Sequence, residues 1–157
     1  MITEQEVRLV GSAAFEVLPA DADESEWLTM RTIGVGASEV AAILGHSRWT
    51  SPYALWAAKT GLTTPEPRTH IQHMGLLLEA PIAQLFAEKH PEYEVVDVGL
   101  VRNITHPHEL ATPDRELLID GAHAGLLEIK TASFGRREDW GDEGTDDFPI
   151  AYRLQCA

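Results

Sequence analysis

Cysteine is the scarcest informative residue in this 157-residue sequence, since Cys156 is the only one. A single thiol cannot form an internal disulfide, a paired-cysteine zinc site or a four-cysteine iron–sulfur cluster. The seven histidines do not compensate. His106 with His108, and His70 with His73, lack a cysteine or a third ligand at a usual zinc spacing. We therefore expect these to be surface histidines.

Long apolar runs are also missing. No stretch approaches the roughly 20 apolar residues that a membrane-spanning helix needs. The first residues lack the basic region and apolar stretch of a secretory signal. We therefore expect a protein that enters no membrane and stays in the compartment where it is made.

Basic residues are few. The sequence has 12 Lys and Arg against 25 Asp and Glu, which gives a formal net charge of −13. Domains that coat DNA by charge alone are usually basic, so this class is disfavoured. An acidic domain can still act on DNA if its carboxylates bind divalent cations at the site and its few cations are grouped locally.

The order of patterns predicts the fold class. Helical patterns come first, and strands follow at Tyr93–Val101, Leu117–Ile119 and Leu126–Lys130. A helix returns near Ile150–Ala157. This order predicts an α/β (α+β) domain, with a small mixed sheet flanked by helices. We expect residues 1–22 to form an irregular or poorly ordered lead-in and residues 23–157 to form one domain.

Several local signals fix expected boundaries. Ser38 is predicted to cap a short helix, Glu39–Leu44, and Ser51 to cap the next one. Pro81 interrupts a longer helical pattern between residues 70 and 90, so a kink or break is expected there. Asp120 and Gly121 predict a tight turn between two strands.

Three tryptophans, Trp27, Trp49 and Trp56, stand at helical spacings beside leucines. Such side chains can stack on nucleic-acid bases, but this pattern is more typical of a buried core. We expect them in the core.

The chemistry-bearing residues gather near the last expected strand. Strand alternation would point Glu128 and Lys130 to one face, and Asp114 supplies a second carboxylate just before the preceding strand. Two carboxylates can hold Mg²⁺, and an adjacent lysine can orient or deprotonate a water that attacks a phosphodiester. The backbone carbonyl of Ile129 is a natural further oxygen ligand. The pattern is short, however, and for these three residues alone an exposed salt bridge along an edge strand is the favoured explanation.

Further motifs resemble a known family, the YqaJ and lambda-exonuclease type of phage recombinase within the PD-(D/E)xK nuclease superfamily. The resemblance covers about residues 27–157 in the family's order. The segments that carry it are Arg31–Ser38, Leu44–Trp49, Ser51–Trp56, Gly75–Glu79 with Pro81, Ala111–Asp114, Leu126–Ala132, Trp140–Gly141 and Pro149–Gln155.

The resemblance implies a role for individual residues. It implies that Glu79, Asp114 and Glu128 bind divalent metal, Mg²⁺ with Mn²⁺ as a substitute. It also implies that Lys130 is the catalytic lysine and that Gln155 contacts the reaction centre or the DNA.

A second group of residues is implied to recognise the DNA end. Arg31 and Ser38 match family positions that hold a terminal 5′-phosphate. A helix start at Ser38 would suit an anion.

The implied activity is a Mg²⁺-dependent exonuclease that digests linear duplex DNA from an end, 5′ to 3′, for phage-type recombination. The implied partners are double-stranded DNA ends, a single-strand annealing protein and further copies in a homo-oligomer. The implied location is the cytoplasm of a bacterium or a phage-infected host. The alternative is a catalytically inactive DNA-end-binding or protein-interaction domain that retains the nuclease fold. A third possibility is a restriction-type endonuclease.

Two departures accompany the resemblance. The family continues beyond the glutamine motif, whereas this sequence ends at Ala157 inside an expected helix, so we expect a shortened domain. Residues 134–148 also hold six acidic residues, which would disfavour close approach of DNA.

Overall fold

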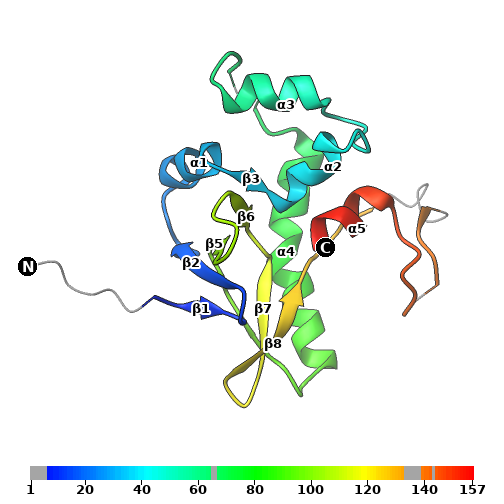
Figure 1. Cartoon of the computed structure of the whole chain (residues 1–157). Helices are drawn as coiled ribbons and strands as arrows, with labels where there is room; N and C mark the ends of the chain where they lie inside the picture. Colours follow the sequence, from blue (N-terminus) through cyan, green and yellow to red (C-terminus); the bar gives the residue numbers. More distant parts are fainter. Residues whose placement is uncertain (1–6, 65–66, 133–138, 143) are drawn as a thin grey trace, which may run out of the picture.

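A computed structural model describes residues 7–64, 67–132, 139–142 and 144–157. Two antiparallel-rich sheets lie side by side, with a long helix behind the smaller one and short helices around the larger one (Figure 1). The α+β fold class predicted from the sequence is confirmed, with two sheets where one was expected.

The larger sheet has the strand order β1-β2-β5-β6-β3. Its members are Leu9–Val10 (β1), Ala14–Leu18 (β2), Val35–Gly36 (β3), Leu100–Asn103 (β5) and Glu109–Ala111 (β6). All neighbours are antiparallel except β3 and β6, which run parallel. The pairing of β3 with β6 ties the segment after α1 to the middle of the chain.

The smaller sheet has the order β4-β7-β8 and is antiparallel. Its strands are Glu94–Val96 (β4), Arg115–Ile119 (β7) and Ala122–Leu127 (β8). The turn between β7 and β8 consists of Asp120 and Gly121, both with positive φ, 51° and 76°. Such a pair matches the twist of a two-residue hairpin, so the predicted turn is confirmed.

Four helical segments precede β4. They are Glu24–Thr32 (α1), the 3₁₀ turn Ala37–Glu39 (η1) with Val40–Ile43 (α2), Pro52–Lys59 (α3) and His70–Lys89 (α4). The predicted start of α3 is confirmed, because the Ser51 side chain accepts a hydrogen bond from the N–H of Ala54 and Pro52 is the first helical residue. The last helix is Ile150–Cys156 (α5), which packs against η1 and α2.

The core is built from small and branched apolar residues. Val10, Val98 and Val101 form one buried cluster, and Leu100 is the largest fully buried side chain. Gly99 lies where the backbone of β2 passes close by, since a Cβ there would stand 1.9 Å from the carbonyl oxygen of Leu18. Only glycine fits at this crossing.

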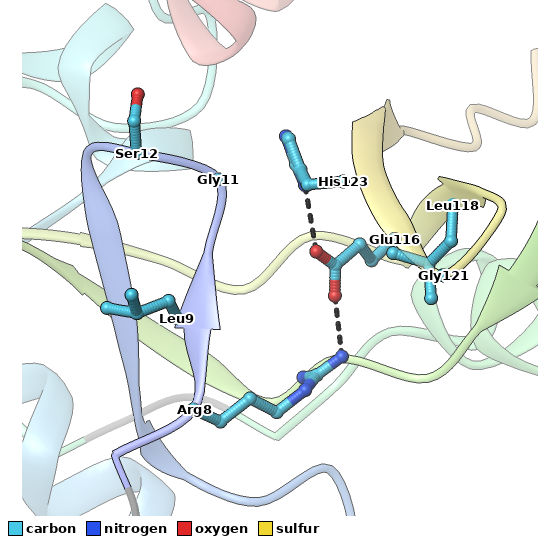
Figure 2. A pocket seen from close by; sticks show the side chains of 8 residues that line it. All are labelled: Arg8, Leu9, Gly11, Ser12, Glu116, Leu118, Gly121 and His123. Carbon is cyan, nitrogen blue, oxygen red and sulfur yellow. Dashed lines mark hydrogen bonds and ion pairs between the residues drawn. The ribbon is translucent and has the colours of Figure 1, made fainter.

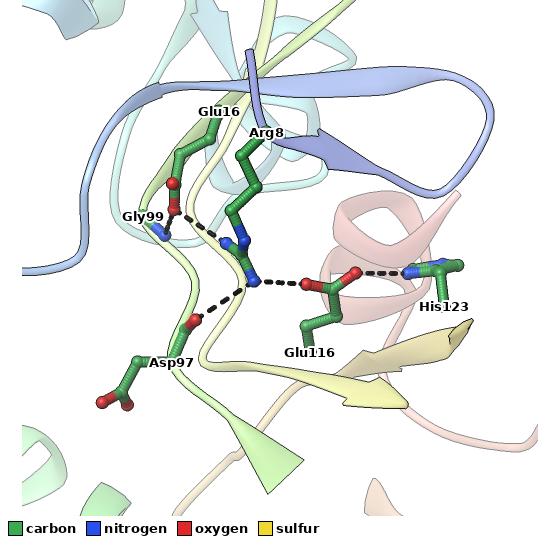
Figure 3. Close-up of polar contacts among 6 residues, drawn as sticks. All are labelled: Arg8, Glu16, Asp97, Gly99, Glu116 and His123. Carbon is green, nitrogen blue, oxygen red and sulfur yellow. Dashed lines mark hydrogen bonds and ion pairs between the residues drawn. The ribbon is translucent and has the colours of Figure 1, made fainter. Parts of the chain in front are cut away.

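A polar network joins the two sheets (Figure 3). The Arg8 guanidinium contacts Glu16 at 2.9 Å and Glu116 at 2.5 Å, and it also donates to the carbonyl oxygen of Asp97. The other oxygen of Glu116 meets Nδ1 of His123 at 2.8 Å. Glu116 is only 3% exposed, and its carboxylate is contacted by Arg8, just before β1, and by His123 on β8.

A hollow of about 580 Å³ opens beside this network, between the β1–β2 turn and the β7–β8 hairpin (Figure 2). Its wall includes Arg8, Ser12, Glu116 and His123. Gly121 and His123 at the β7–β8 turn belong to its wall, and Asp114 and Glu128 do not.

Two expectations about elements were wrong, and a third was wrong in part. Part of the expected lead-in, residues 9–10 and 14–18, is paired into the larger sheet, because Arg8 and Glu16 anchor it there. The expected strand at Tyr93–Val101 is divided into β4 and β5. The break allowed for at Pro81 does not occur, because α4 is continuous for 20 residues, and the alternative, a kink, stays a prediction.

The tryptophan prediction also fails in part. Trp49 is 71% exposed and Trp56 is 52% exposed, whereas Trp27 is partly buried and donates to Thr112. Among the described residues, no helix combines the length and apolar character needed to cross a bilayer.

Candidate active site

Asp114 and Glu128 lie at the same end of the smaller sheet. Asp114 directly precedes β7 and Glu128 directly follows β8. These strands pair with Arg115 opposite Leu127, which sets the two carboxylates next to each other across the ladder. Glu128–Lys130 were expected to be part of a strand, but β8 ends at Leu127.

Just beyond β8, a hydrogen bond from a backbone N–H to a side chain takes the place of strand pairing. The N–H of Ile129 donates to Oδ2 of Asp114 at 2.5 Å. This bond fixes the exit of the chain from the sheet and orients the Asp114 carboxylate. The role of the Ile129 carbonyl as a metal ligand stays a prediction.

Lys130, Glu128 and Gln155 form a compact cluster. The ammonium of Lys130 pairs with Oε1 of Glu128, and Nε2 of Gln155 donates to that same atom at 2.5 Å. Lys130 also lies 5.5 Å from the centre of the Tyr152 ring. Tyr152 and Gln155 are three residues apart on α5, so one face of this helix contacts the pair.

Glu79 reaches the same region from α4. Partial burial raises the pKa of Glu79, and the negative charges of Asp114 and Glu128 raise it further, while Arg115 and Lys130 act in the opposite direction. A second contact agrees with this placement: a Cβ at Gly75, one turn earlier on α4, would lie 3.6 Å from Oγ1 of Thr131. The three carboxylates therefore influence one another electrostatically.

The carboxylates keep unpaired oxygens. Within the described residues, Oδ1 of Asp114, Oε2 of Glu128 and both oxygens of Glu79 accept no hydrogen bond. All-oxygen donor sets suit hard divalent cations such as Mg²⁺. The same described residues contain no group of three acidic, histidine or cysteine side chains already arranged around a metal position. Binding a cation between all three carboxylates would therefore require their side chains to rotate.

A second cluster surrounds Arg31. Its Nη2 donates to Oγ of Ser38 at 3.4 Å and pairs with Oε1 of Glu39 at 3.1 Å. The guanidinium lies 4.6 Å from the centre of the Trp27 ring. The two residues predicted from the sequence, Arg31 and Ser38, are thus brought together.

The expected helix cap at Ser38 is wrong. Ser38 lies inside η1, with no capping bond from its side chain, and α2 has only four residues. A helix this short contributes little dipole field, so the positive charge beside Ser38 comes from the Arg31 guanidinium.

Sequence reasoning missed two charged residues here. Glu39 accepts from the N–H of Gly36 and pairs with Lys59 at 2.7 Å, and Lys59 donates to the carbonyl oxygens of Arg31 and Gly34. From sequence alone, Glu39 reads as a first-turn acid and Lys59 as a last-turn base of ordinary helices. A hollow of about 260 Å³ lies beside Ser38 and Glu39, against α3.

The two clusters are joined by α5. This helix contacts η1 and α2 (Figure 1). It also carries Gln155, whose side chain contacts Glu128. Part of the acidic segment 134–148, residues 134–138 and 143, lies outside the described residues.

Two comparisons with known proteins point to the same family. A family model described as the YqaJ-like viral recombinase domain matches residues 26–157. A curated relative, the uncharacterized protein YqaJ of Bacillus subtilis strain 168, is 32% identical over 143 residues. The match covers 89% of this chain and 43% of the relative, so the chain spans less than half the length of that protein.

Proposed function

Since the chain belongs to the family of YqaJ-like viral recombinase domains, we propose that it is a metal-dependent deoxyribonuclease acting on ends of linear duplex DNA. The observation that carries the proposal is the meeting of Glu79, Asp114 and Glu128 with Lys130 and Gln155 at one end of the smaller sheet. Four separate segments supply these residues. A surface salt bridge between Glu128 and Lys130 alone would need none of the others.

The donor set supports a Mg²⁺ cofactor. Glu79, Asp114 and Glu128 would hold the ion through their free oxygens, with the Ile129 carbonyl as a further ligand. A divalent cation held there would neutralise charge on the phosphate and lower the pKa of a water. It would also offset the repulsion from Asp114 and Glu128, which adds to burial in raising the pKa of Glu79.

Lys130 and Gln155 would act on the substrate side of the carboxylates. Lys130 holds an ammonium within contact of Glu128, where it would orient the attacking water or stabilise charge in the transition state. Gln155 fixes Glu128 through Oε1 and leaves Oε2 free. Its amide would thereby set the orientation of one ligand.

Arg31 and Ser38 support action at an end rather than inside a duplex. A guanidinium beside a hydroxyl is suited to a terminal phosphate dianion. We propose that this pocket holds the 5′-phosphate and that digestion proceeds 5′ to 3′. The single-stranded tails would then serve recombination in the bacterial cytoplasm, with an annealing protein as partner and a homo-oligomer as the working form.

The acidic composition fits this proposal better than tight, charge-driven DNA binding. The net charge of −13 would give weak affinity along a duplex. Binding would then depend on the end pocket and on cations at the carboxylates.

The second candidate is a DNA-end-binding domain without catalysis. Two observations favour it. Lys130 and Gln155 both contact Oε1 of Glu128. The described residues also contain no group of three ligands already arranged around a metal position. Under this candidate the end pocket would work and the carboxylates would not.

One experiment separates these functions. End-labelled linear duplex is incubated with the full chain and Mg²⁺, alongside closed circular DNA. Release of labelled nucleotides from linear DNA only is the expected result. Retention of intact duplex would favour the binding domain, and cleavage of circles would favour an endonuclease.

A further inference from the structure

We propose that Glu39 is a positioning residue that presents Arg31 to the terminal phosphate. The inference rests on the proposed end pocket and adds a residue to it. Glu39 contacts Arg31 at 3.1 Å through Oε1, and through Oε2 it contacts both Lys59 and the N–H of Gly36 at 2.7 Å. The carboxylate is therefore held from three directions, and it holds Arg31 in turn.

Glu39 leaves the other donors of Arg31 available. Within the described residues, only Nη2 of the guanidinium makes hydrogen bonds, to Ser38 and Glu39. One face of the group lies over Trp27 at 4.6 Å. With Nη2 and one face fixed, the N–H groups of Nη1 and Nε remain for an incoming phosphate. They lie on different edges of the guanidinium, so each would make a single charge-assisted bond.

Charge balance allows an acid to stand in an anion pocket. Lys59 donates to Glu39 and to the carbonyl oxygens of Arg31 and Gly34, so its charge stays beside Glu39. The trio of Arg31, Lys59 and Glu39 carries a net charge of +1. Glu39 therefore orients Arg31 without cancelling the attraction for a phosphate.

Gly36 makes the packing sensitive to one methyl group. A Cβ at Gly36 would lie 3.0 Å from Nη2 of Arg31 and 3.3 Å from Oε2 of Glu39. The backbone there is ordinary extended chain, φ −75° and ψ 146°, which alanine adopts without strain. Gly36→Ala is thus a steric probe of the Arg31–Glu39 pair that leaves all charges in place.

An alternative role for Glu39, as a competitor of the phosphate, makes the opposite prediction. If Glu39 occupied the place of the phosphate, it would act as an inhibitory competitor. Removing its charge would then increase the preference for phosphorylated ends. If Glu39 positions Arg31, the same change decreases that preference.

The test compares initial rates on linear duplexes that carry a 5′-phosphate or a 5′-hydroxyl, with Mg²⁺ and the full chain. The measured quantity is the ratio of kcat/KM on the two ends. Glu39→Ala should lower this ratio on the order of tenfold, mainly through KM for phosphorylated ends, as expected for one charge-assisted contact. Glu39→Gln and Gly36→Ala should lower it by less, because each keeps part of the arrangement.

Two further variants separate a failure of the end pocket from a failure of the positioning role of Glu39. Glu24→Gln removes an exposed acid paired with Arg68 and should leave the ratio unchanged. Arg31→Ala should bring the ratio to about one. If Arg31→Ala leaves the ratio as it was, or if the parent protein shows no preference, the end pocket itself is wrong.

If Arg31→Ala abolishes the preference while all Glu39 and Gly36 variants keep it or increase it, the positioning role alone is overturned. Circular dichroism confirms that each variant is folded. Should Glu39→Ala fail to fold, Glu39→Gln and Gly36→Ala decide the matter, since both preserve an acceptor for the Gly36 N–H.

Discussion

Gln155 donates a hydrogen bond of 2.5 Å to Oε1 of Glu128, the same atom that receives the ammonium of Lys130. The last helix thereby contacts the acidic site directly, although 27 residues separate the two side chains along the chain. Holding Oε1 in this way leaves Oε2 as the free ligand atom.

Replacing Gln155 tests this arrangement. Gln155→Ala should reduce Mg²⁺-dependent cleavage by about tenfold or more, because Glu128 loses one of the two donors that orient it. Gln155→Glu should reduce it further, since a carboxylate would face Glu128. Single-turnover rates on linear duplex measure the effect. Normal rates in both variants would remove Gln155 from the site.

Replacing Lys130 tests the catalytic role proposed for its ammonium. Lys130→Ala should lower the cleavage rate by roughly 10²-fold or more, the usual effect of losing a group that acts on the reacting water. The side chain is 29% exposed and outside the core, so thermal stability should change little. Lys89→Ala, at the end of α4, is the matched control and should cleave normally. Near-normal turnover of Lys130→Ala would contradict the mechanism.

The sequence predicted the acidic site better than its surroundings. Strand alternation and spacing indicated Asp114, Glu128 and Lys130 as candidates, but without the family resemblance they favoured an exposed salt bridge. Glu79, Gln155, Arg31 and Ser38 came from the family resemblance. The structure brings each of them into one of two clusters.

The failures share a physical cause. Strand β1 has two residues, and Arg8 anchors it through Glu116, which lies 108 positions away. No local pattern encodes such a contact. Glu39 was missed for the same reason, since its partner Lys59 lies in a different helix.

Metal dependence follows from the all-oxygen ligand set. Mg²⁺ or Mn²⁺ should support cleavage, Ca²⁺ should bind without supporting it well, and excess EDTA should stop it. Mg²⁺ should also raise the unfolding temperature, because it binds only the folded site. Asp114→Asn should lose both effects, and Glu94→Gln, an exposed acid on β4, should lose neither. Full activity in EDTA would rule the metal site out.

The Arg8 network predicts an unusual stability effect. Arg8→Ala should destabilise the protein by about 3 kcal/mol, because it leaves the buried Glu116 carboxylate without its arginine. Arg68→Ala breaks an exposed pair with Glu24 and should change stability by less than about 1 kcal/mol. Urea unfolding gives both values. Equal effects from the two variants would mean that Glu116 does not depend on Arg8.

The raised pKa of Glu79 predicts how stability depends on pH. Its folded pKa lies above the ordinary value of 4.5, because of burial and the charges of Asp114 and Glu128. In the window just above 4.5 the folded protein therefore binds more protons at this residue than the unfolded chain. The unfolding free energy falls as pH rises through that window, and the loss remains at neutral pH.

Glu79→Gln removes this loss. In metal-free buffer, the variant should unfold at a higher temperature than the parent protein at pH 7, and the difference should shrink toward pH 4, where Glu79 is protonated in both states. Adding Mg²⁺ at pH 7 should make the parent the more stable of the two. Only the parent keeps the Glu79 carboxylate that would help to bind the ion. Glu94→Gln provides the control for a change of net charge. A Glu79→Gln variant with lower metal-free stability at pH 7 would contradict the raised pKa of Glu79.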